Sequence, residues 1–271
     1  MKFAICNEIF EGWDMERAMS FIKEVGYDAI EIAPFTVNKD VRNISQEERH
    51  KIKSLAEKVG IEISGIHWVL VKTEGLHLTH PDSSIRKKTS DYFVELVKLC
   101  SDIGGKYIIN GSPKQRDVLD GVSYEQAWKW GTESFKAPVQ LAEELGITIC
   151  FEPLAPSETN FINTASEAVS FASQFQSEAM STILDVKAMS SESLSIPEII
   201  QNTGKKFSYF HANDANLKGP GFGDVDFVPI AKALREVDYD GFVSVEVFKF
   251  EEGPEAIATQ SFEYLKKSFT Q

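Results

Sequence analysis

Four apolar runs in the second half of the chain each end in a side chain that can bind a metal ion. These end residues are Glu152 (ICFE), Asp185 (TILD), His211 (SYFH) and Glu246 (VSVE). Three carboxylates and one imidazole form an oxygen-rich donor set, which suits a divalent cation with positions left for water or substrate oxygens. The set predicts one divalent metal ion, with Mn²⁺ as the first choice and Mg²⁺, Co²⁺ or Zn²⁺ as alternatives.

Each of these residues also has an ordinary structural interpretation. A single carboxylate after a strand is more often a helix N-cap, and a single histidine there is more often a packed residue. Four consecutive runs that end in this way are poorly explained by such roles, since converging carboxylates repel one another unless a cation compensates them. The metal hypothesis therefore requires a fold that brings the four ends of these runs together.

A recurring junction indicates which fold this is. An amphipathic helix ends, a glycine follows and a short apolar strand begins, as in KEVGYDAIEI (23–32), EKVGIEISGI (57–66), SDIGGKYIIN (101–110) and EELGITICFE (143–152). The glycines are placed to end their helices in the left-handed conformation. In a fifth copy, REVDYDGFVSVE (235–246), Asp238 takes this place.

Eight strands are predicted along the chain, near 3–6, 29–32, 62–66, 106–110, 148–152, 181–185, 207–211 and 242–247. Helix candidates follow each of them. Three helix starts are marked by Asp14 as an N-cap and by the capping boxes Ser45/Glu48 and Thr164/Glu167, whereas Pro138 is expected to break or start a helix within 124–145.

Eight β-then-α units in about 250 residues predict a single (β/α)8 TIM barrel, an α/β fold, as one domain over residues 1–271. An open doubly wound sheet would carry a glycine-rich phosphate loop after an early strand, but the first strand here ends in Cys6-Asn7-Glu8. In a barrel the active site lies at the C-terminal ends of the strands, where the four residues would converge.

Composition excludes several classes of function. The 271 residues include 28 Lys and Arg against 41 Asp and Glu, a net charge of −13, which disfavours nucleic-acid and anionic membrane partners. No apolar run approaches the ~20 residues that span a bilayer, and the N-terminus lacks a signal-peptide core. Three cysteines without paired spacing indicate neither disulfides nor a cysteine zinc site. A cytoplasmic protein is expected.

At these residues the sequence resembles the xylose-isomerase-like barrels, specifically the sugar-phosphate isomerase/epimerase group that includes the D-tagatose and D-psicose 3-epimerases. The similar blocks are ISGIHW (63–68), FEPLAPSETNFINTASEA (151–168), ILDVKAM (183–189), FHANDANLKGPGFGDVDF (210–227) and YDGFVSVEVF (239–248). The resemblance implies that the four residues hold one metal and that Glu152 and Glu246 form the acid/base pair. It also implies that Glu158 binds the substrate near its carbonyl end.

The chain departs from the epimerases at two substrate contacts. Where they carry a His three residues after the ligand Asp, this chain has Ala188, and where they carry an Arg six residues after the ligand His, it has Leu217. Lys187 is predicted to compensate as a substrate-binding residue, with Lys218 and Arg116 as alternatives.

Further residues near the predicted site receive specific interpretations. His67 is predicted to contact the substrate, with Trp68 beside it at the barrel rim. Asp214 is predicted to support the ligands from outside their shell or to cap a loop, and Asn213 and Asn216 are interpreted as turn formers.

The resulting hypothesis is a metal-dependent carbohydrate isomerase or epimerase that abstracts a proton next to a carbonyl through a metal-stabilised enediolate. A sugar or inosose dehydratase using the same enolate chemistry is the first alternative, and a non-catalytic sugar-binding barrel is the second. The related AP-endonucleases are disfavoured by the five histidines and the charge of −13. A small carbohydrate is the expected partner, and barrels of this group are often homo-oligomers.

Overall fold

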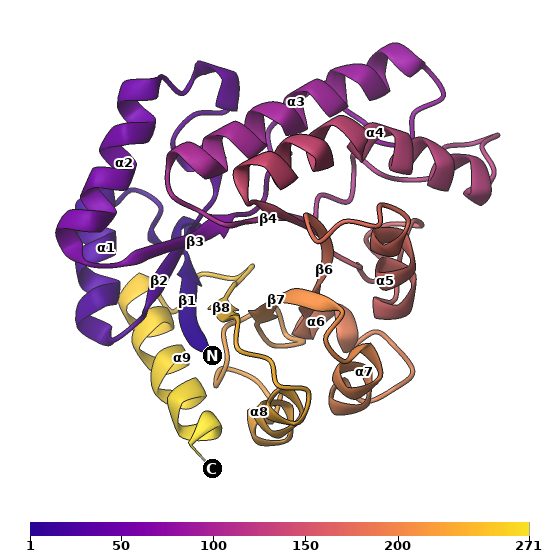
Figure 1. Cartoon of the computed structure of the whole chain (residues 1–271). Helices are drawn as coiled ribbons and strands as arrows, with labels where there is room; N and C mark the ends of the chain where they lie inside the picture. Colours follow the sequence, from indigo (N-terminus) through magenta and orange to yellow (C-terminus); the bar gives the residue numbers. More distant parts are fainter. Residues whose placement is uncertain (271) are drawn as a thin grey trace.

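The computed structural model describes residues 1–270, and these form a closed barrel of eight parallel strands surrounded by helices (Figure 1). The strands follow the barrel in chain order, and β1 pairs with β8 to close it. The strands are β1 Lys2–Cys6, β2 Ala29–Ile32, β3 Glu62–Ile66, β4 Tyr107–Asn110, β5 Thr148–Phe151, β6 Met180–Asp185, β7 Phe207–Ala212 and β8 Phe242–Val245. The predicted (β/α)8 barrel and its eight strands are therefore confirmed.

The helices occupy the connections between the strands. They are α1 Met15–Val25, α2 Gln46–Val59, α3 Ser83–Asp102, α4 Tyr124–Leu145, α5 Ala165–Ser173, α6 Val186–Met189, α7 Ile196–Thr203, α8 Phe227–Glu236 and α9 Pro254–Phe269. Three short 3-10 helices lie in the early loops, η1 Asn7–Phe10, η2 Pro34–Thr36 and η3 Val41–Asn43. The last helix, α9, packs beside α1 and α8, which completes the outer ring (Figure 1).

The predicted start and stop signals act as expected. Asp14 caps α1 by accepting from the Glu16 and Arg17 N–H groups, and both capping boxes are formed. Asp238 has a φ of 55°, so an aspartate takes the left-handed position that glycines occupy in the other junctions.

The expectation for Pro138 is wrong, because α4 runs without interruption from Tyr124 to Leu145 with this proline inside it. Proline removes one backbone hydrogen bond from a helix, but the helix face around it is buried, including Phe135, Val139 and Ala142. Packing of this face against the barrel outweighs the local preference of one residue.

Two layers of apolar side chains hold the barrel together. The larger layer fills the space between the strands and the helices, and a smaller one fills the barrel lumen. The lumen layer consists of Ala4, Ala29, Ile109, Cys150, Ile183, Tyr209 and Phe242. Because side chains alternate along a strand, residues two or four positions further along point into the same lumen, nearer its C-terminal mouth.

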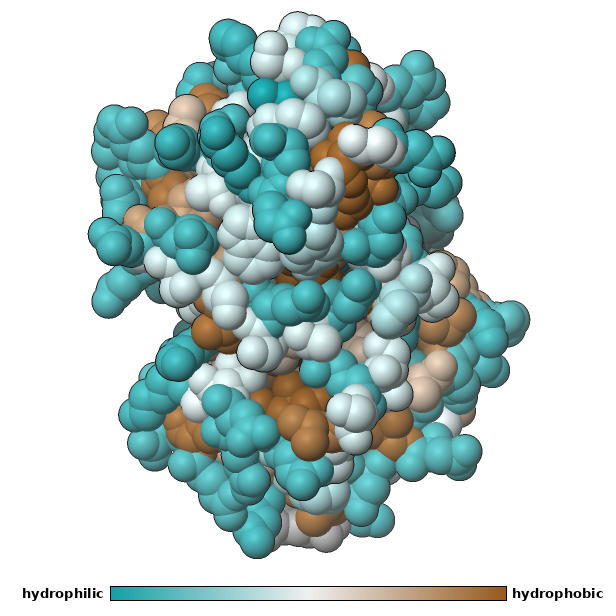
Figure 2. All heavy atoms as spheres, turned by 90° about the vertical axis from the view of Figure 1, so that its right-hand side faces the viewer, coloured by the Kyte–Doolittle hydropathy of each residue, from teal (hydrophilic) through white to brown (hydrophobic). Residues whose placement is uncertain are grey.

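The outside of the molecule is mainly polar. Figure 2 shows one side of it, where hydrophilic side chains cover most of the surface and hydrophobic atoms appear in separate patches. Within residues 1–270, the helices are all too short or too polar to cross a bilayer. The three cysteines are buried and free.

Candidate metal centre

The strand ends bring the four predicted ligands together at the mouth of the barrel. Asp185 and His211 lie within β6 and β7, and Glu152 and Glu246 directly follow β5 and β8. Each lies two or four residues after a lumen residue of its strand, so all four point inward. All four are buried, and one ligand atom from each lies within 4.8 Å of the others. The predicted convergence is thus observed, and the role of the residues as ligands stays a prediction.

Asp185 has the helix N-cap role that was considered from the sequence, and its second oxygen has a side-chain partner. Its Oδ1 accepts from the N–H of Ala188 at 2.7 Å and caps the short helix α6. Its Oδ2 accepts from Asn213 Nδ2 at 2.5 Å. Asn213 also accepts from the N–H of Lys187 at 2.7 Å, so its interpretation as a simple turn former is wrong.

His211 is oriented by Glu31, a buried carboxylate on β2. His211 Nε2 lies 3.1 and 3.2 Å from the two Glu31 oxygens, and Glu31 also accepts from Tyr209 and Ser244 at 2.9 and 2.6 Å. Burial opposes ionisation of Glu31, but the charges of His211 and His67 lower its pKa to about 2. Since an ionised carboxylate only accepts, Nε2 carries a hydrogen, and Nδ1 is the ring nitrogen that faces the cluster.

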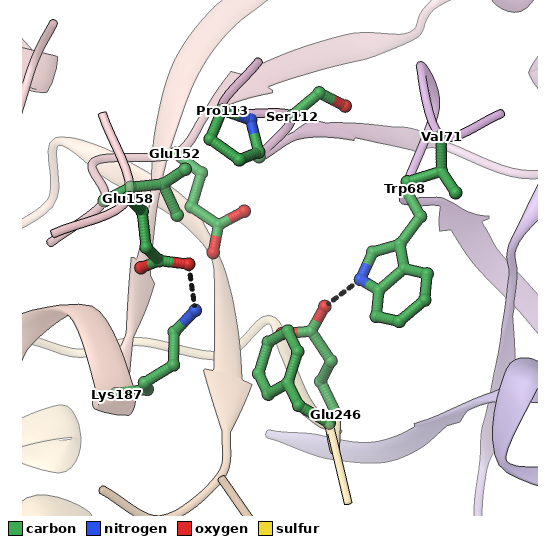
Figure 3. A pocket seen from close by; sticks show the side chains of 11 residues that line it. Trp68, Val71, Ser112, Pro113, Glu152, Glu158, Lys187 and Glu246 are labelled. Carbon is green, nitrogen blue, oxygen red and sulfur yellow. Dashed lines mark hydrogen bonds and ion pairs between the residues drawn. The ribbon is translucent and has the colours of Figure 1, made fainter. Parts of the chain in front are cut away.

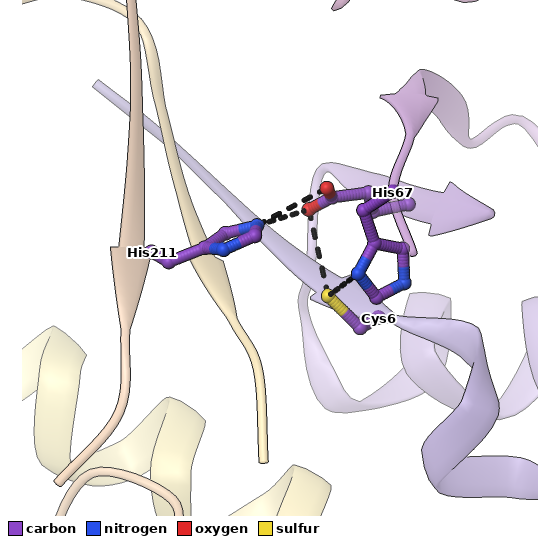
Figure 4. A group of neighbouring side chains, drawn as sticks. Cys6, His67 and His211 are labelled. Atoms are coloured by element: carbon purple, nitrogen blue, oxygen red, sulfur yellow. Dashed lines mark hydrogen bonds and ion pairs between the residues drawn. The ribbon is translucent and has the colours of Figure 1, made fainter. Parts of the chain in front are cut away.

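A second group of potential ligands shares His211 with the first cluster and also contains Cys6, Glu31 and His67. Figure 4 shows His211 and His67 approaching it from two sides, with Cys6 below them. Burial raises the pKa of the Cys6 thiol well above its usual value, so the thiol is protonated. Both oxygens of Glu31 already accept hydrogen bonds. These four residues therefore support the first cluster through hydrogen bonds and do not form a second set of metal ligands.

Glu246 is held by side chains from the loop after β3. Trp68 Nε1 donates to Glu246 Oε1 at 2.7 Å, and His67 Nδ1 lies 3.5 Å from the same oxygen. The other oxygen, Oε2, lies 3.2 Å from His211 Nδ1. Burial by itself raises the pKa of Glu246, but the two histidines outweigh it and hold this pKa well below its ordinary value.

Glu152 is held only through its backbone, within residues 1–270. Its carbonyl accepts from Nη1 of the fully buried Arg116 at 2.6 Å, and a Cβ at Gly111 would collide with its carboxylate. Burial and the charges of Glu246 and Asp185 raise the pKa of Glu152 to about 8. The surroundings of the two glutamates therefore shift their pKa values in opposite directions, down for Glu246 and up for Glu152.

The cluster has the properties that a divalent cation requires. His211 Nδ1 and Glu246 Oε2 are buried, have no hydrogen-bond partner in the described part of the chain and face each other. Burial raises the pKa of Asp185, as it does that of Glu152, which is the mark of carboxylates that lack a compensating positive charge. Three carboxylates and one imidazole in this arrangement fit Mn²⁺ and similar ions.

A cavity of about 210 Å³ opens onto the cluster (Figure 3). It is lined by Trp68, Val71, Gly111, Ser112, Pro113, Glu152, Leu154, Glu158, Lys187, Glu246 and Phe248. Lys187 Nζ lies 2.9 Å from Glu158 Oε1 and 4.2 Å from the centre of the Phe248 ring. Burial opposes the charge of Lys187, but Asp185 and Glu152 raise its pKa above the ordinary value, so a cation lies in the cavity wall.

Two further predicted site residues lie outside this cavity wall. His67 is fully buried behind Trp68, with Nε2 at 2.9 Å from Glu8 Oε2, so its predicted contact with a substrate stays a prediction. Asp214 accepts from the N–H groups of Asn216 and Val225 and thereby shapes the loop after β7. Of the two roles considered for Asp214, the structure shows the loop cap.

Sequence reasoning placed Trp68 at the barrel rim but did not predict the supporting contacts of Glu31, Trp68 and Glu8. A glutamate inside the fully buried run AIEI was a signal for Glu31, since a buried carboxylate needs partners. Nothing in the local sequence shows that the loop containing Trp68 reaches Glu246 after β8, because 178 residues separate them.

Comparisons with known proteins agree with this architecture. The profile of the xylose isomerase-like TIM barrel family matches residues 19–268. A D-psicose 3-epimerase of Ruminiclostridium cellulolyticum is 28% identical over 232 residues, which cover 84% of this chain and 76% of that protein.

Solved structures share the fold along the whole chain. The D-psicose 3-epimerase from Clostridium cellulolyticum H10, crystallised with D-tagatose, has a TM-score of 0.85 at 23% identity and covers 99% of both chains. The IOLI protein with a bound zinc atom has a TM-score of 0.76 at 18% identity and covers 99% of this chain and 96% of that one.

Proposed function

Because this chain belongs to the xylose isomerase-like TIM barrel family, we propose that it is a divalent-metal-dependent sugar epimerase. The observation that carries this proposal is the buried cluster of Glu152, Asp185, His211 and Glu246, whose two glutamates line the cavity. Epimerase relatives such as the R. cellulolyticum protein support the same class of reaction.

In this proposal the four residues of the cluster hold one divalent ion, with Mn²⁺ as the first choice. When bound, such an ion polarises a substrate carbonyl and stabilises the negative charge that develops on proton removal. The zinc atom in the IOLI structure shows that a barrel of this fold can hold a transition metal.

The two glutamates carry the proton transfers. Glu152 and Glu246 approach the cavity from different strands, and Figure 3 shows their carboxylates on two sides of the same space. One carboxylate removes the proton from the carbon beside the carbonyl, and the other returns a proton to its opposite face. An aldose–ketose isomerase can work with one base, so the paired arrangement favours epimerisation.

Lys187 and Glu158 bind the substrate in this scheme. They are ion-paired at 2.9 Å and both line the cavity, so a substrate hydroxyl can accept from the ammonium and donate to the carboxylate. Lys187 thereby supplies a polar contact on the side where the family's histidine is replaced by Ala188, which is buried.

A solvent-deuterium exchange assay tests the proposal. Protein loaded with Mn²⁺ is incubated in D₂O with a panel of ketoses, sugar phosphates and inososes. We expect metal-dependent deuterium incorporation beside the carbonyl together with formation of the epimer, and loss of epimer formation after chelation and in Glu246→Gln.

The products distinguish the related reactions. An aldose product would indicate an isomerase, and loss of water would indicate a dehydratase. If the chain binds no divalent metal ion, the proposed function is wrong.

A further inference from the structure

The two oxygens of Glu246 have different neighbours. Oε1 accepts from Trp68 Nε1 at 2.7 Å, whereas Oε2 lies 3.2 Å from His211 Nδ1 and has no hydrogen-bond partner within residues 1–270. An indole N–H can only donate, so the oxygen it contacts is kept as an acceptor. This leaves Oε2 as the oxygen that faces the cluster.

We propose that Trp68 is a positioning residue that fixes Glu246 Oε1 and thereby turns Oε2 toward the other ligands of the metal centre. The inference rests on the metal site of the proposed function. It concerns the orientation of Glu246 and not the identity of the sugar.

The backbone of Trp68 has a conformation that is unfavourable for a bulky side chain. Its φ is 50°, in the left-handed region that bulky residues rarely adopt. The neighbouring hydrogen bonds hold it there, since the N–H of His67 donates to the carbonyl of Ile32 and the N–H of Val71 donates to the carbonyl of Trp68, each at 3.1 Å. Strained conformations of this kind cluster at functional sites.

The ring of Trp68 is held equally firmly. It lies between Phe35 and Phe248, with ring centres 5.9 and 6.0 Å away and planes tilted by 19° and 25°. We call these three residues the aromatic stack. Lys72 and Lys187 each contact one of the two phenylalanine rings, with Nζ 4.3 Å from the centre of Phe35 and 4.2 Å from the centre of Phe248. The stack fixes the plane of the indole, and its N–H edge faces Glu246 (Figure 3).

A tryptophan that only formed a wall of the cavity would not need its N–H group. Trp68→Phe keeps an aromatic ring in the stack but removes the donor to Glu246. Trp128→Phe is the matched control, because Trp128 packs against Phe161 and Phe171 on the outer layer, away from the cluster.

The test measures Mn²⁺ affinity by titration calorimetry beside the thermal unfolding of each variant. Trp68→Phe is expected to bind Mn²⁺ 10- to 100-fold more weakly, the usual effect of losing a partner of a metal ligand. Trp128→Phe is expected to bind as the wild type does. In a Glu246→Ala background, Trp68→Phe is expected to have no further effect, since it acts through Glu246.

Two calorimetric results would overturn the inference. One is wild-type Mn²⁺ affinity in a folded Trp68→Phe variant. The other is a loss of Mn²⁺ affinity on Trp68→Phe that is as large in the Glu246→Ala background as in the wild type.

A second readout does not depend on metal binding. The ¹H–¹⁵N resonance of the Trp68 indole, assigned by substituting the other three tryptophans, should shift in Glu246→Ala. If the wild type binds no Mn²⁺, the proposed metal centre fails, and this resonance still decides the inference. An unchanged resonance would contradict the contact, even where Trp68→Phe does not fold.

Discussion

The two glutamates at the floor of the cavity are held in very different ways. Glu246 is fixed through Trp68 and lies beside two histidines that hold its pKa well below the ordinary value. Glu152 is fixed only through its backbone, and burial beside other carboxylates raises its pKa to about 8. The environment of Glu246 thus favours the ionised carboxylate, whereas that of Glu152 favours a carboxyl group that can take up a proton.

The largest effect is expected when either glutamate loses its charge. Glu246→Gln and Glu152→Gln should each reduce epimer formation by about 10³-fold or more, since each removes one of the two proton-transfer groups. Under the proposed mechanism each variant keeps deuterium exchange with only one of the two epimers, and the retained epimer differs between the variants. Both variants are assayed at saturating Mn²⁺. Exchange of the same epimer by both would contradict the assignment of the two glutamates to opposite faces of the substrate.

Metal removal is expected to lower stability, because the cluster carries uncompensated carboxylates. Mn²⁺ at 100 times its Kd should stabilise the folded chain by about 2.7 kcal/mol, measured as a rise in Tm over the chelated protein. The rise should be smaller in Glu246→Gln than in the wild type at the same Mn²⁺ concentration. Equal Tm values with and without Mn²⁺ would show that the folded chain does not bind the ion.

Glu31→Gln tests the support of His211. The substitution weakens the contact that orients the imidazole, so Mn²⁺ affinity should fall by about 10- to 100-fold. Glu192→Gln is a control, because Glu192 accepts from the Ala165 N–H outside the barrel lumen. An unchanged affinity in Glu31→Gln would show that His211 does not depend on this partner.

Lys187→Met tests the substrate side of the cavity. Loss of the ammonium should raise the KM for the sugar by about 10-fold, as expected for one charged hydrogen bond, and leave Mn²⁺ affinity near that of the wild type. Lys218→Met is the matched control, since Lys218 pairs with Glu252 and does not line the cavity. A KM that does not change would remove Lys187 from the binding site.

The smallest effect on the site is expected from Asp14→Ala, which removes the N-cap of α1. Unfolding free energy should fall by about 1 kcal/mol in a denaturant titration, with no change in Mn²⁺ affinity. A change in Mn²⁺ affinity would show that a loss of stability far from the site also weakens metal binding. The Mn²⁺ affinities of the other variants would then have to be corrected for their loss of stability.

Much of the architecture could be predicted, because its signals are local. Capping residues such as Ser45 and Thr164 act within one helical turn, and the strand runs that end in Glu152, Asp185, His211 and Glu246 display their polar ends in the sequence itself. Pro138 is the exception, since burial of its helix face depends on the rest of the barrel.

The eight strands, most helix boundaries and the four residues at the mouth of the barrel could be predicted from local sequence patterns. How these four residues are held depends on the folded barrel, because their supports come from distant parts of the chain. Glu31 reaches His211 across 180 residues of chain, and Trp68 reaches Glu246 across 178. Alternation along a strand predicts the face on which a side chain lies, but its partner across the lumen depends on how the sheet closes.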